Sequence, residues 1–319
     1  MKKTIYEVIN VIASLVIIIL VALVIKYNIK EREKIGKPHT DVTKLTDKLW
    51  TMNESAEGVM IGDNFNAFLK ASYIAVGTPP DCQYYKIANG FPRHSYNLEA
   101  FYPDEDGIIR YHNDDGSAAS NAHLVVDVSA YQTGIDWEQL KASGVDRVMI
   151  RGGYRGYSNG SIVADKMFEE HITAALDNDM KVGVYIFSQA LNYDEGVEEA
   201  RFLLDLIKDY KVELPLVIDT EALFVDGART EDLDNESRTN AMVGFCETVK
   251  AAGYEPMIYS NRNWFVQNLD MSLLKDYSLW VAQYSGCPDF PYLFKGWQFT
   301  DEGKLNGLDI NLDLNVWFD

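Results

Sequence analysis

Two carboxylates stand two residues apart at the end of an apolar run near the middle of the chain. Residues 214–218 read Leu-Pro-Leu-Val-Ile, which is typical of a buried strand, and Asp219, Thr220 and Glu221 follow directly. Side chains alternate along a strand, so Asp219 and Glu221 would share one face with Cα atoms about 7 Å apart. Like charges this close push their pKa values apart, leaving a proton donor beside an ionised carboxylate. The spacing indicates a catalytic pair, although an isolated Asp-x-Glu more often only solvates a strand end.

The elements that would position this pair follow a regular pattern from residue 124 onward. The predicted strands are Leu124–Val128, Arg147–Arg151, Lys181–Ser188, Leu216–Asp219, Pro256–Ser260, Leu279–Gln283, Gly296–Phe299 and Leu312–Val316. The predicted helices are Trp137–Ala142, Ala164–Asn178, Glu195–Tyr210, Glu236–Ala252 and Arg262–Leu269, with Asp194 and either Asp234 or Asn235 as N-caps. Alternating strands and helices predict right-handed βαβ units and a parallel sheet. With about eight strands and five helices, the fold class is α/β, an incomplete TIM-like (β/α) barrel whose last strands are joined by loops.

In such barrels the active site forms at the carboxyl ends of the strands, so polar residues there are candidates. These are Asp127, Arg151, Ser188, Gln189, Asp219, Glu221, Tyr259, Gln283, Tyr284, Gln298 and Asp313. Aromatic residues occur among them: Tyr131, Tyr154, Tyr185, Trp280 and Trp297. Aromatic faces stack on sugar rings, although barrel packing is an equally ordinary role for such side chains. The pattern favours a hydroxyl-rich ligand.

Composition narrows the class of protein further. The chain has 319 residues, 47% hydrophobic and 12% aromatic, enough to bury a full core. The net charge of −19 excludes a nucleic-acid partner held by charge. The three cysteines, Cys82, Cys246 and Cys287, show no zinc-site spacing and fit either three thiols or one disulfide with a leftover thiol.

The N-terminus carries a targeting signal. Residues 8–25 form an uncharged, largely apolar run preceded by Lys2 and Lys3 and followed by Lys26. As a helix this run would span about 27 Å, close to the hydrocarbon thickness of a bilayer. No Ala-x-Ala site follows, so a retained transmembrane anchor is favoured over a cleavable signal peptide. Counting Lys and Arg in the flanks places the C-terminal side in the cytoplasm, whereas the two-lysine head favours export.

These features divide the chain into four parts. Residues 1–27 are predicted to form the membrane anchor, and residues 28–45 a charged spacer. Residues 46–120 are aromatic enough to be partly folded but give no functional signal, and a loop is expected at 112–117. Residues 121–319 form the predicted barrel domain.

The barrel domain resembles the family 25 glycoside hydrolases, which are lysozymes of the N-acetylmuramidase type. The resemblance covers about residues 122–319. It rests on eight blocks in the family's order: 126–129 with 134–137, 150–156, 183–190, 217–221, 258–260, 279–284, 297–299 and 311–315. One departure is Ile186, where many members carry a histidine, and this puts one substrate contact in doubt.

The resemblance implies hydrolysis of the β-1,4 bond between N-acetylmuramic acid and N-acetylglucosamine in peptidoglycan, with retention and without a metal or cofactor. Glu221 would be the general acid and Asp219 its ionised partner, acting either as nucleophile or on the substrate's own acetamido group. The resemblance also implies that Asp127 and Asp313 are active-site acids that tune pKa values. The substrate-binding candidates are Arg151, Tyr154, Tyr185, Gln189, Tyr259, Trp280, Gln283, Tyr284, Trp297 and Gln298.

Other readings remain open at this point. An anchored but catalytically idle domain could bind wall glycan as a scaffold, although the presence of all four acids argues against it. A chitinase is disfavoured by the short domain and its 313–315 ending. Because peptidoglycan lies outside the cytoplasmic membrane, function places the N-terminus in the cytoplasm and the barrel on the wall side. Partners would be peptidoglycan strands, the membrane and, more weakly, envelope or secretion-assembly proteins engaged in wall remodelling.

Overall fold

The computed structural model describes residues 71–78 and 81–319. The expected anchor (1–27), the spacer (28–45) and residues 46–70 lie outside the described residues. In the described part, no helix has both the length and the apolar character needed to cross a membrane. A compact unit spans Ala88–Asp319, and before it an antiparallel hairpin joins β1 (Tyr73–Val76) to β2 (Gln83–Lys86).

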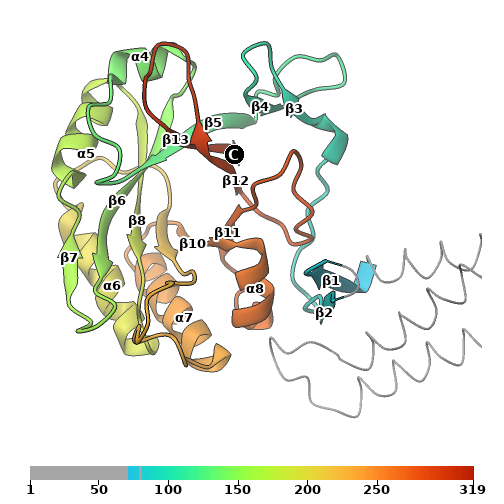
Figure 1. Cartoon of the computed structure of the whole chain (residues 1–319). Helices are drawn as coiled ribbons and strands as arrows, with labels where there is room; N and C mark the ends of the chain where they lie inside the picture. The colour runs from blue at the N-terminus through green and yellow to red at the C-terminus, as the bar shows by residue number, and fades with distance from the viewer. Residues whose placement is uncertain (1–70, 79–80) are drawn as a thin grey trace, which may run out of the picture. The chain divides into compact units, whose positions relative to one another are not determined.

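The compact unit is built on a closed barrel, which confirms the predicted fold class (Figure 1). Around the barrel the strands are β5 (Ala122–Val128), β6 (Arg147–Arg155), β8 (Lys181–Phe187), β9 (Leu216–Asp219), β10 (Pro256–Asn261), β11 (Ser278–Ala282), β12 (Gly296–Gly303) and β13 (Leu312–Phe318). Pairing of β5 with both β6 and β13 closes the ring. A short strand, β7 (Ile162–Ala164), extends the far end of β6 as an antiparallel hairpin.

The last strand runs against the others. β5, β6 and β8–β12 are parallel along the ring, whereas β13 is antiparallel to both β12 and β5. The carboxyl ends of the parallel strands therefore share a rim with the amino end of β13. Asp313 reaches the site from the start of its strand, where it stands in register with Asp127 near the end of β5.

Helices cover the barrel along the strands from β6 to β10. They are α4 (Trp137–Ala142), α5 (Phe168–Asp177), α6 (Tyr193–Leu206), α7 (Asn235–Ala251) and α8 (Arg262–Asn268), with a short 3-10 turn, η2 (Met271–Leu273), after α8. Asp234 caps α7 as predicted, because its side chain accepts a hydrogen bond from the Ser237 backbone N–H at 2.7 Å. The cap of α6 is Asn192, not Asp194, since its Oδ1 accepts from the Glu195 N–H at 3.1 Å. Asp194 lies inside the first turn.

Residues before the barrel cover the side that has no helices. This segment, 88–121, contains η1 (Leu98–Ala100), β3 (Phe101–Pro103) and β4 (Ile109–Tyr111), and the expected loop at 112–117 follows β4. Tyr96 stacks on Phe318 of β13 with ring centroids 4.0 Å apart, and the Phe101 ring meets the edge of Trp297 at 5.0 Å. The segment therefore belongs to the same compact unit as the barrel, which begins earlier than the boundary expected at residue 121.

Side chains fill the barrel below its rim. Val125, Met149, Tyr185, Leu214, Val217, Met257, Tyr259, Trp280, Ala282 and Trp317 form one buried cluster. Two glycines make room for members of this cluster. A Cβ at Gly183 would lie 2.5 Å from the Met149 sulfur, and one at Gly296 would lie 2.6 Å from the Trp317 ring.

Helices α6 and α7 approach each other through two more glycines. A Cβ at Gly196 would lie 2.0 Å from the Ala241 carbonyl oxygen, and a Cβ at Gly244 would lie 2.2 Å from the Tyr193 carbonyl oxygen. These contacts are with backbone, which cannot rotate away. The two helices can therefore keep this spacing only while both positions lack a side chain.

Gly244→Ala should lower the free energy of unfolding by about 1–3 kcal/mol, because the overpacking penalty exceeds the helix-propensity gain of alanine. Urea unfolding followed by circular dichroism measures this. Lys250→Ala on the exposed face of α7 is the matched control and should leave stability nearly unchanged. Equal stability of Gly244→Ala and wild type would contradict the close packing.

Candidate active site

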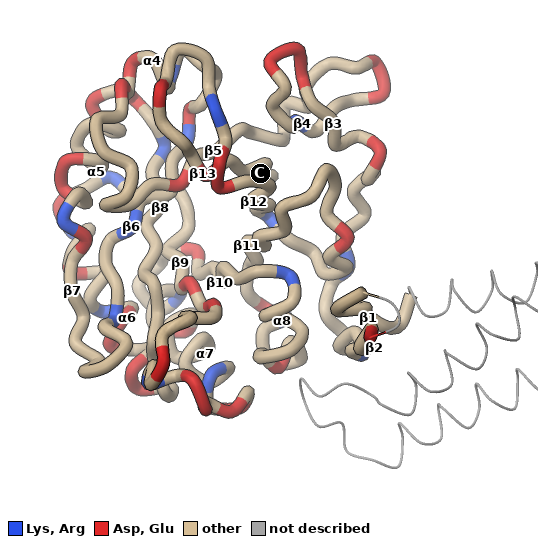
Figure 2. The backbone as a smooth tube through the Cα atoms, in the orientation of Figure 1, with Lys and Arg blue, Asp and Glu red and all other residues tan. Residues whose placement is uncertain are grey.

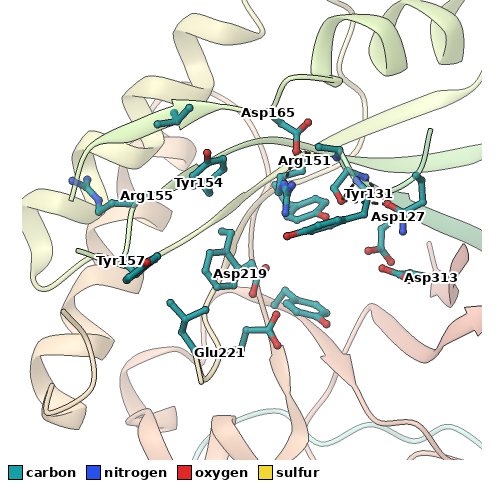
Figure 3. A pocket seen from close by; sticks show the side chains of 18 of the residues that line it. Asp127, Tyr131, Arg151, Tyr154, Arg155, Tyr157, Asp165, Asp219, Glu221 and Asp313 are labelled. Carbon is teal, nitrogen blue, oxygen red and sulfur yellow. Dashed lines mark hydrogen bonds and ion pairs between the residues drawn. The ribbon is translucent and has the colours of Figure 1, made fainter. Parts of the chain in front are cut away.

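A cavity of about 1080 Å³ opens at the rim of the barrel (Figure 3). All four predicted acids, Asp127, Asp219, Glu221 and Asp313, line it. Of the predicted substrate-binding residues, those that line the cavity are Arg151, Tyr154, Tyr185, Tyr259, Trp280, Tyr284 and Gln298. Residues on all eight strands of the barrel thus converge on one space. Acidic residues are also spread over the rest of the unit, as Figure 2 shows, and two more of them, Asp165 and Asp301, line the cavity.

Asp127 is the most firmly held of the acids. Its Oδ2 accepts hydrogen bonds from Gln298 Nε2 at 2.9 Å and from Asn315 Nδ2 at 2.8 Å. The residue is only 4% exposed, and burial raises its pKa to about 6 although both amide donors and Asp313 act to lower it. Two N–H donors on one oxygen fit an ionised carboxylate, so Asp127 carries a fixed negative charge at neutral pH.

A second layer of side chains fixes the two amides. The hydroxyls of Tyr259 and Tyr284 both donate to Gln298 Oε1 at 2.9 Å, and Trp280 Nε1 donates to Asn315 Oδ1 at 2.7 Å. Each amide oxygen thus accepts from an aromatic residue, which leaves each NH₂ group facing Asp127. Three predicted residues, Tyr259, Tyr284 and Trp280, therefore hold the amides of Gln298 and Asn315 in place.

Asp313 lies beside Asp127 across the β5–β13 pairing, and the two side chains hydrogen-bond (Figure 3). Burial and the neighbouring Asp127 charge raise the pKa of Asp313 to about 9. Asp313 is therefore protonated at neutral pH and donates to Asp127. This pair carries one negative charge.

Asp219 and Glu221 form the second pair. Asp219 ends β9 and is 4% exposed, and its side chain hydrogen-bonds that of Glu221 in the loop that follows. Burial, then the charges of Glu221 and Asp127, raise the pKa of Asp219 well above its usual value, while burial raises the pKa of Glu221 to about 7. Both carboxyls are therefore harder to ionise than free ones. That Asp219 is the ionised member and Glu221 the proton donor stays a prediction.

Three predicted substrate-binding residues do not line the cavity. Gln189 is 1% exposed and accepts a hydrogen bond from Thr230 Oγ1 at 2.7 Å, which ties down the loop after Glu221. Gln283 accepts from the Asp289 backbone N–H. Trp297 is fully buried against Phe101, because neighbouring strand residues face opposite sides and Gln298 occupies the inner one.

The departure at Ile186 removes no contact at this cavity. Ile186 is fully buried and is not among the lining residues. It follows Tyr185, whose side chain faces inward, so strand alternation turns Ile186 toward the helix layer.

Sequence reasoning missed several residues of the site. Asn315 lies in one of the family-like blocks but was not predicted to be functional, and it supports the site through its hydrogen bond to Asp127. Four further residues line the cavity: Asp165, Lys166, Leu223 and Val225. The period of two along β13 places Asn315 on the same face as Asp313, which was a usable signal. The loop residues gave none, because loop conformation does not follow a period.

The described residues contain no cluster of three or more His, Cys, Asp or Glu side chains arranged to hold a metal ion. The cavity instead offers paired carboxyls of unequal pKa, a fixed negative charge and aromatic walls. Cleavage of an acetal bond needs a proton donor for the leaving oxygen and a negative charge that stabilises the developing cation. The cavity has groups suited to both roles.

Two known proteins are similar to this chain over part of its length. The autolytic lysozyme of Clostridium acetobutylicum is 24% identical over 191 residues, covering 60% of this chain and 54% of that protein. The D-alanyl-L-alanine endopeptidase of Streptococcus phage B30 is 28% identical over 218 residues, covering 63% of this chain and 44% of that one. This chain therefore spans about half the length of these relatives.

Solved structures show the same fold. The modular autolysin LytC of Streptococcus pneumoniae matches with a TM-score of 0.56 at 22% identity, over 78% of this chain and 61% of LytC. A family 25 glycosyl hydrolase from Bacillus anthracis matches with a TM-score of 0.53 at 25% identity, over 66% of this chain and 93% of that one. The model of the glycosyl hydrolases family 25 matches residues 126–308, which is more than half of the chain and includes Asp127, Asp219 and Glu221, so this chain belongs to the glycosyl hydrolases family 25.

Proposed function

We propose that the chain is a peptidoglycan hydrolase, a lysozyme of the N-acetylmuramidase type that cleaves the β-1,4 bond after N-acetylmuramic acid with retention. The observation that carries the proposal is the convergence of two carboxyl pairs, Asp219 with Glu221 and Asp127 with Asp313, in one cavity of a family 25 barrel. The name of an autolytic lysozyme relative and a LytC structure with a synthetic peptidoglycan ligand support the same substrate.

In the proposed reaction Glu221 donates its proton to the glycosidic oxygen as the bond to the anomeric carbon breaks. The acetamido oxygen of the same sugar attacks that carbon, and Asp219 accepts the acetamido N–H and stabilises the positive charge. Water then attacks, gives its proton to Glu221 and restores the acetamido group with net retention. Direct attack by Asp219 is the alternative route with the same stereochemical outcome.

The proton must be on Glu221 when the bond breaks, whereas in the free protein burial raises the pKa of both carboxyls of the pair. Substrate binding resolves this. An acetamido N–H that donates to Asp219 favours its ionised form, and the existing hydrogen bond between the two carboxyls provides the path for the proton to reach Glu221. The fixed charge of Asp127 keeps a proton on this pair, because it raises both pKa values.

We also propose that residues 8–25 anchor the chain in the cytoplasmic membrane, with the N-terminus in the cytoplasm and the barrel on the wall side. The apolar run in the sequence and the location of peptidoglycan support this topology. Wall remodelling by the chain's own cell, within a secretion or other envelope assembly, fits a tethered hydrolase, and co-localisation with assembly proteins tests it.

Glu221→Gln should lower the release of new reducing ends from purified peptidoglycan by about 100-fold or more, because the amide cannot donate the required proton. Glu169→Gln makes the same chemical change on the exposed face of α5 and should leave the rate unchanged. If wild type and Glu221→Gln are equally inactive while both pellet with the walls, the protein is a wall-binding scaffold instead.

The pH dependence of kcat/KM should be a bell with its maximum between about pH 6 and 7. On the acidic side Asp127 takes up a proton as the pH falls through about 6, and on the alkaline side Glu221 loses its proton as the pH rises through about 7. Asn315→Leu removes a donor that lowers the pKa of Asp127. The acidic limb should then move to higher pH while the alkaline limb stays, and a stationary acidic limb would disprove the role of Asn315.

Protease added to intact protoplasts that express the chain should remove the barrel, detected by an antibody against its C-terminal end. A cytoplasmic marker protein should survive as the control for membrane integrity. Full protection of the barrel would rule out the proposed topology.

A further inference from the structure

Arg151 is held rigidly on the wall of the cavity. Its Nε donates to Asp165 Oδ2 at 2.6 Å, and the Asp165 side chain is only 1% exposed. Asp165 is fixed in turn by the backbone N–H groups of Ala130 at 3.1 Å and Met167 at 2.9 Å. The guanidinium group is therefore pre-positioned, and a ligand that binds it need not order it first.

The outer end of this guanidinium group is available to a ligand. Within 71–78 and 81–319, no hydrogen bond joins its two terminal nitrogens to the protein. Its carbon lies 5.2 Å from the centre of the Tyr131 ring and 5.9 Å from that of Tyr154, so the rings flank the group without using its N–H donors. The side chain is 15% exposed, and it lines the cavity.

The other cations of the cavity wall are arranged differently. Arg155 is engaged by the carboxylates of Glu198 and Glu199 and by the carbonyl oxygens of Gly160 and Glu195. Lys166 lines the cavity but is exposed at its edge. Arg151 alone combines a fixed position with a planar pair of unused donors, a geometry suited to one carbonyl or carboxylate group.

The neighbours of Arg151 point to the substrate group that its free donors would bind. Arg151 stands in register with Tyr185 on the neighbouring strand, and its charge acts on both Tyr185 and Asp219. In the proposed reaction Asp219 holds the acetamido group on C2 of muramic acid. The next ring carbon, C3, carries the lactyl ether, which ends in a carbonyl group, whereas N-acetylglucosamine has only a hydroxyl at C3.

We propose that Arg151 is a specificity-determining residue whose terminal nitrogens donate hydrogen bonds to the lactyl carbonyl group of the muramic acid bound at Asp219. This inference rests on the proposed function and identifies the group by which the site distinguishes a muramyl residue from plain N-acetylglucosamine. Tyr131 and Tyr154 keep the guanidinium plane in place, and Asp165 sets its direction.

The test compares kcat/KM of two forms of the full-length chain, wild type and Arg151→Gln, on two substrates. The substrates are glycan strands stripped of their peptides, with the lactyl carboxyl group either intact or reduced to an alcohol. For wild type, reduction should lower kcat/KM by about 10- to 100-fold, the value of a hydrogen bond to a charged group. Arg151→Gln should lose about as much on intact strands and nothing further on reduced strands.

If reduction of the lactyl group lowers kcat/KM by the same factor in Arg151→Gln as in wild type, the proposal is overturned. Independent losses of this kind would show that Arg151 acts through Asp219 or the fold and not on the lactyl group. Lys166→Gln, which removes another cation from the same cavity, should keep the full sensitivity to lactyl reduction. Loss of that sensitivity in Lys166→Gln would assign the carbonyl group to Lys166 and also overturn the proposal.

Arg151→Lys covers the case in which the glutamine variant does not fold, since it keeps a cation beside Asp165 and Asp219. Reduced sensitivity to lactyl reduction in this variant supports the proposal, and full sensitivity overturns it. The proposed function is rejected by a different result, namely that wild type releases no reducing ends from intact strands. If wild type cleaves the strands but the two losses are independent of each other, only the role of Arg151 is rejected.

Discussion

A single buried negative charge, on Asp127, organises the catalytic rim. Two amides donate to one of its oxygens, and the aromatic residues behind those amides decide which way each amide points. Burial of the neighbouring carboxyl groups, and after it this fixed charge, make each of them harder to ionise, so protons stay on Asp313 and on the Asp219–Glu221 pair at neutral pH. The protein obtains acid chemistry near pH 7 by burying one charge well, without any cationic partner for Asp127 among the described residues.

The reversed direction of β13 makes this arrangement compatible with a barrel. A parallel eighth strand would bring its carboxyl end to the rim, whereas here the amino end arrives, with Asp313 beside Asp127 and Asn315 one pleat below. Without a crossover helix, β12 and β13 are joined by a short connection, and their outer faces are left for the segment 88–121 to cover. The departure from the regular barrel thus serves both the site and the packing.

Much of this was predictable from periodicity. The strands and helices, and the positions of Asp127, Asp219 and Glu221, follow from runs of apolar residues and from the residues that end them, whereas Asp313 stands at the start of its strand. Pairing Trp297 with Gln298 as substrate contacts failed because a strand cannot turn adjacent side chains to one face. The role of 88–121 was hidden for another reason: its aromatic residues form short elements whose partners, such as Phe318, lie about two hundred residues away. The raised pKa values of Asp219 and Glu221 depend first on burial, which no spacing encodes.

The aromatic cover over β12 and β13 is the route by which a force on the chain before residue 88 would reach the barrel. The chain enters the compact unit at Ala88, whose N–H donates to the Tyr292 hydroxyl at 2.8 Å, and Phe91 then packs on the Tyr292 ring. Further along, Tyr96 contacts Phe318, and Phe101 contacts Trp297. Tension on the upstream chain would therefore be borne first by the connection before β12 and then by the outer faces of the two strands whose inner faces carry Gln298 and Asn315. A load of this kind acts behind the buried charge, one strand thickness from the catalytic rim.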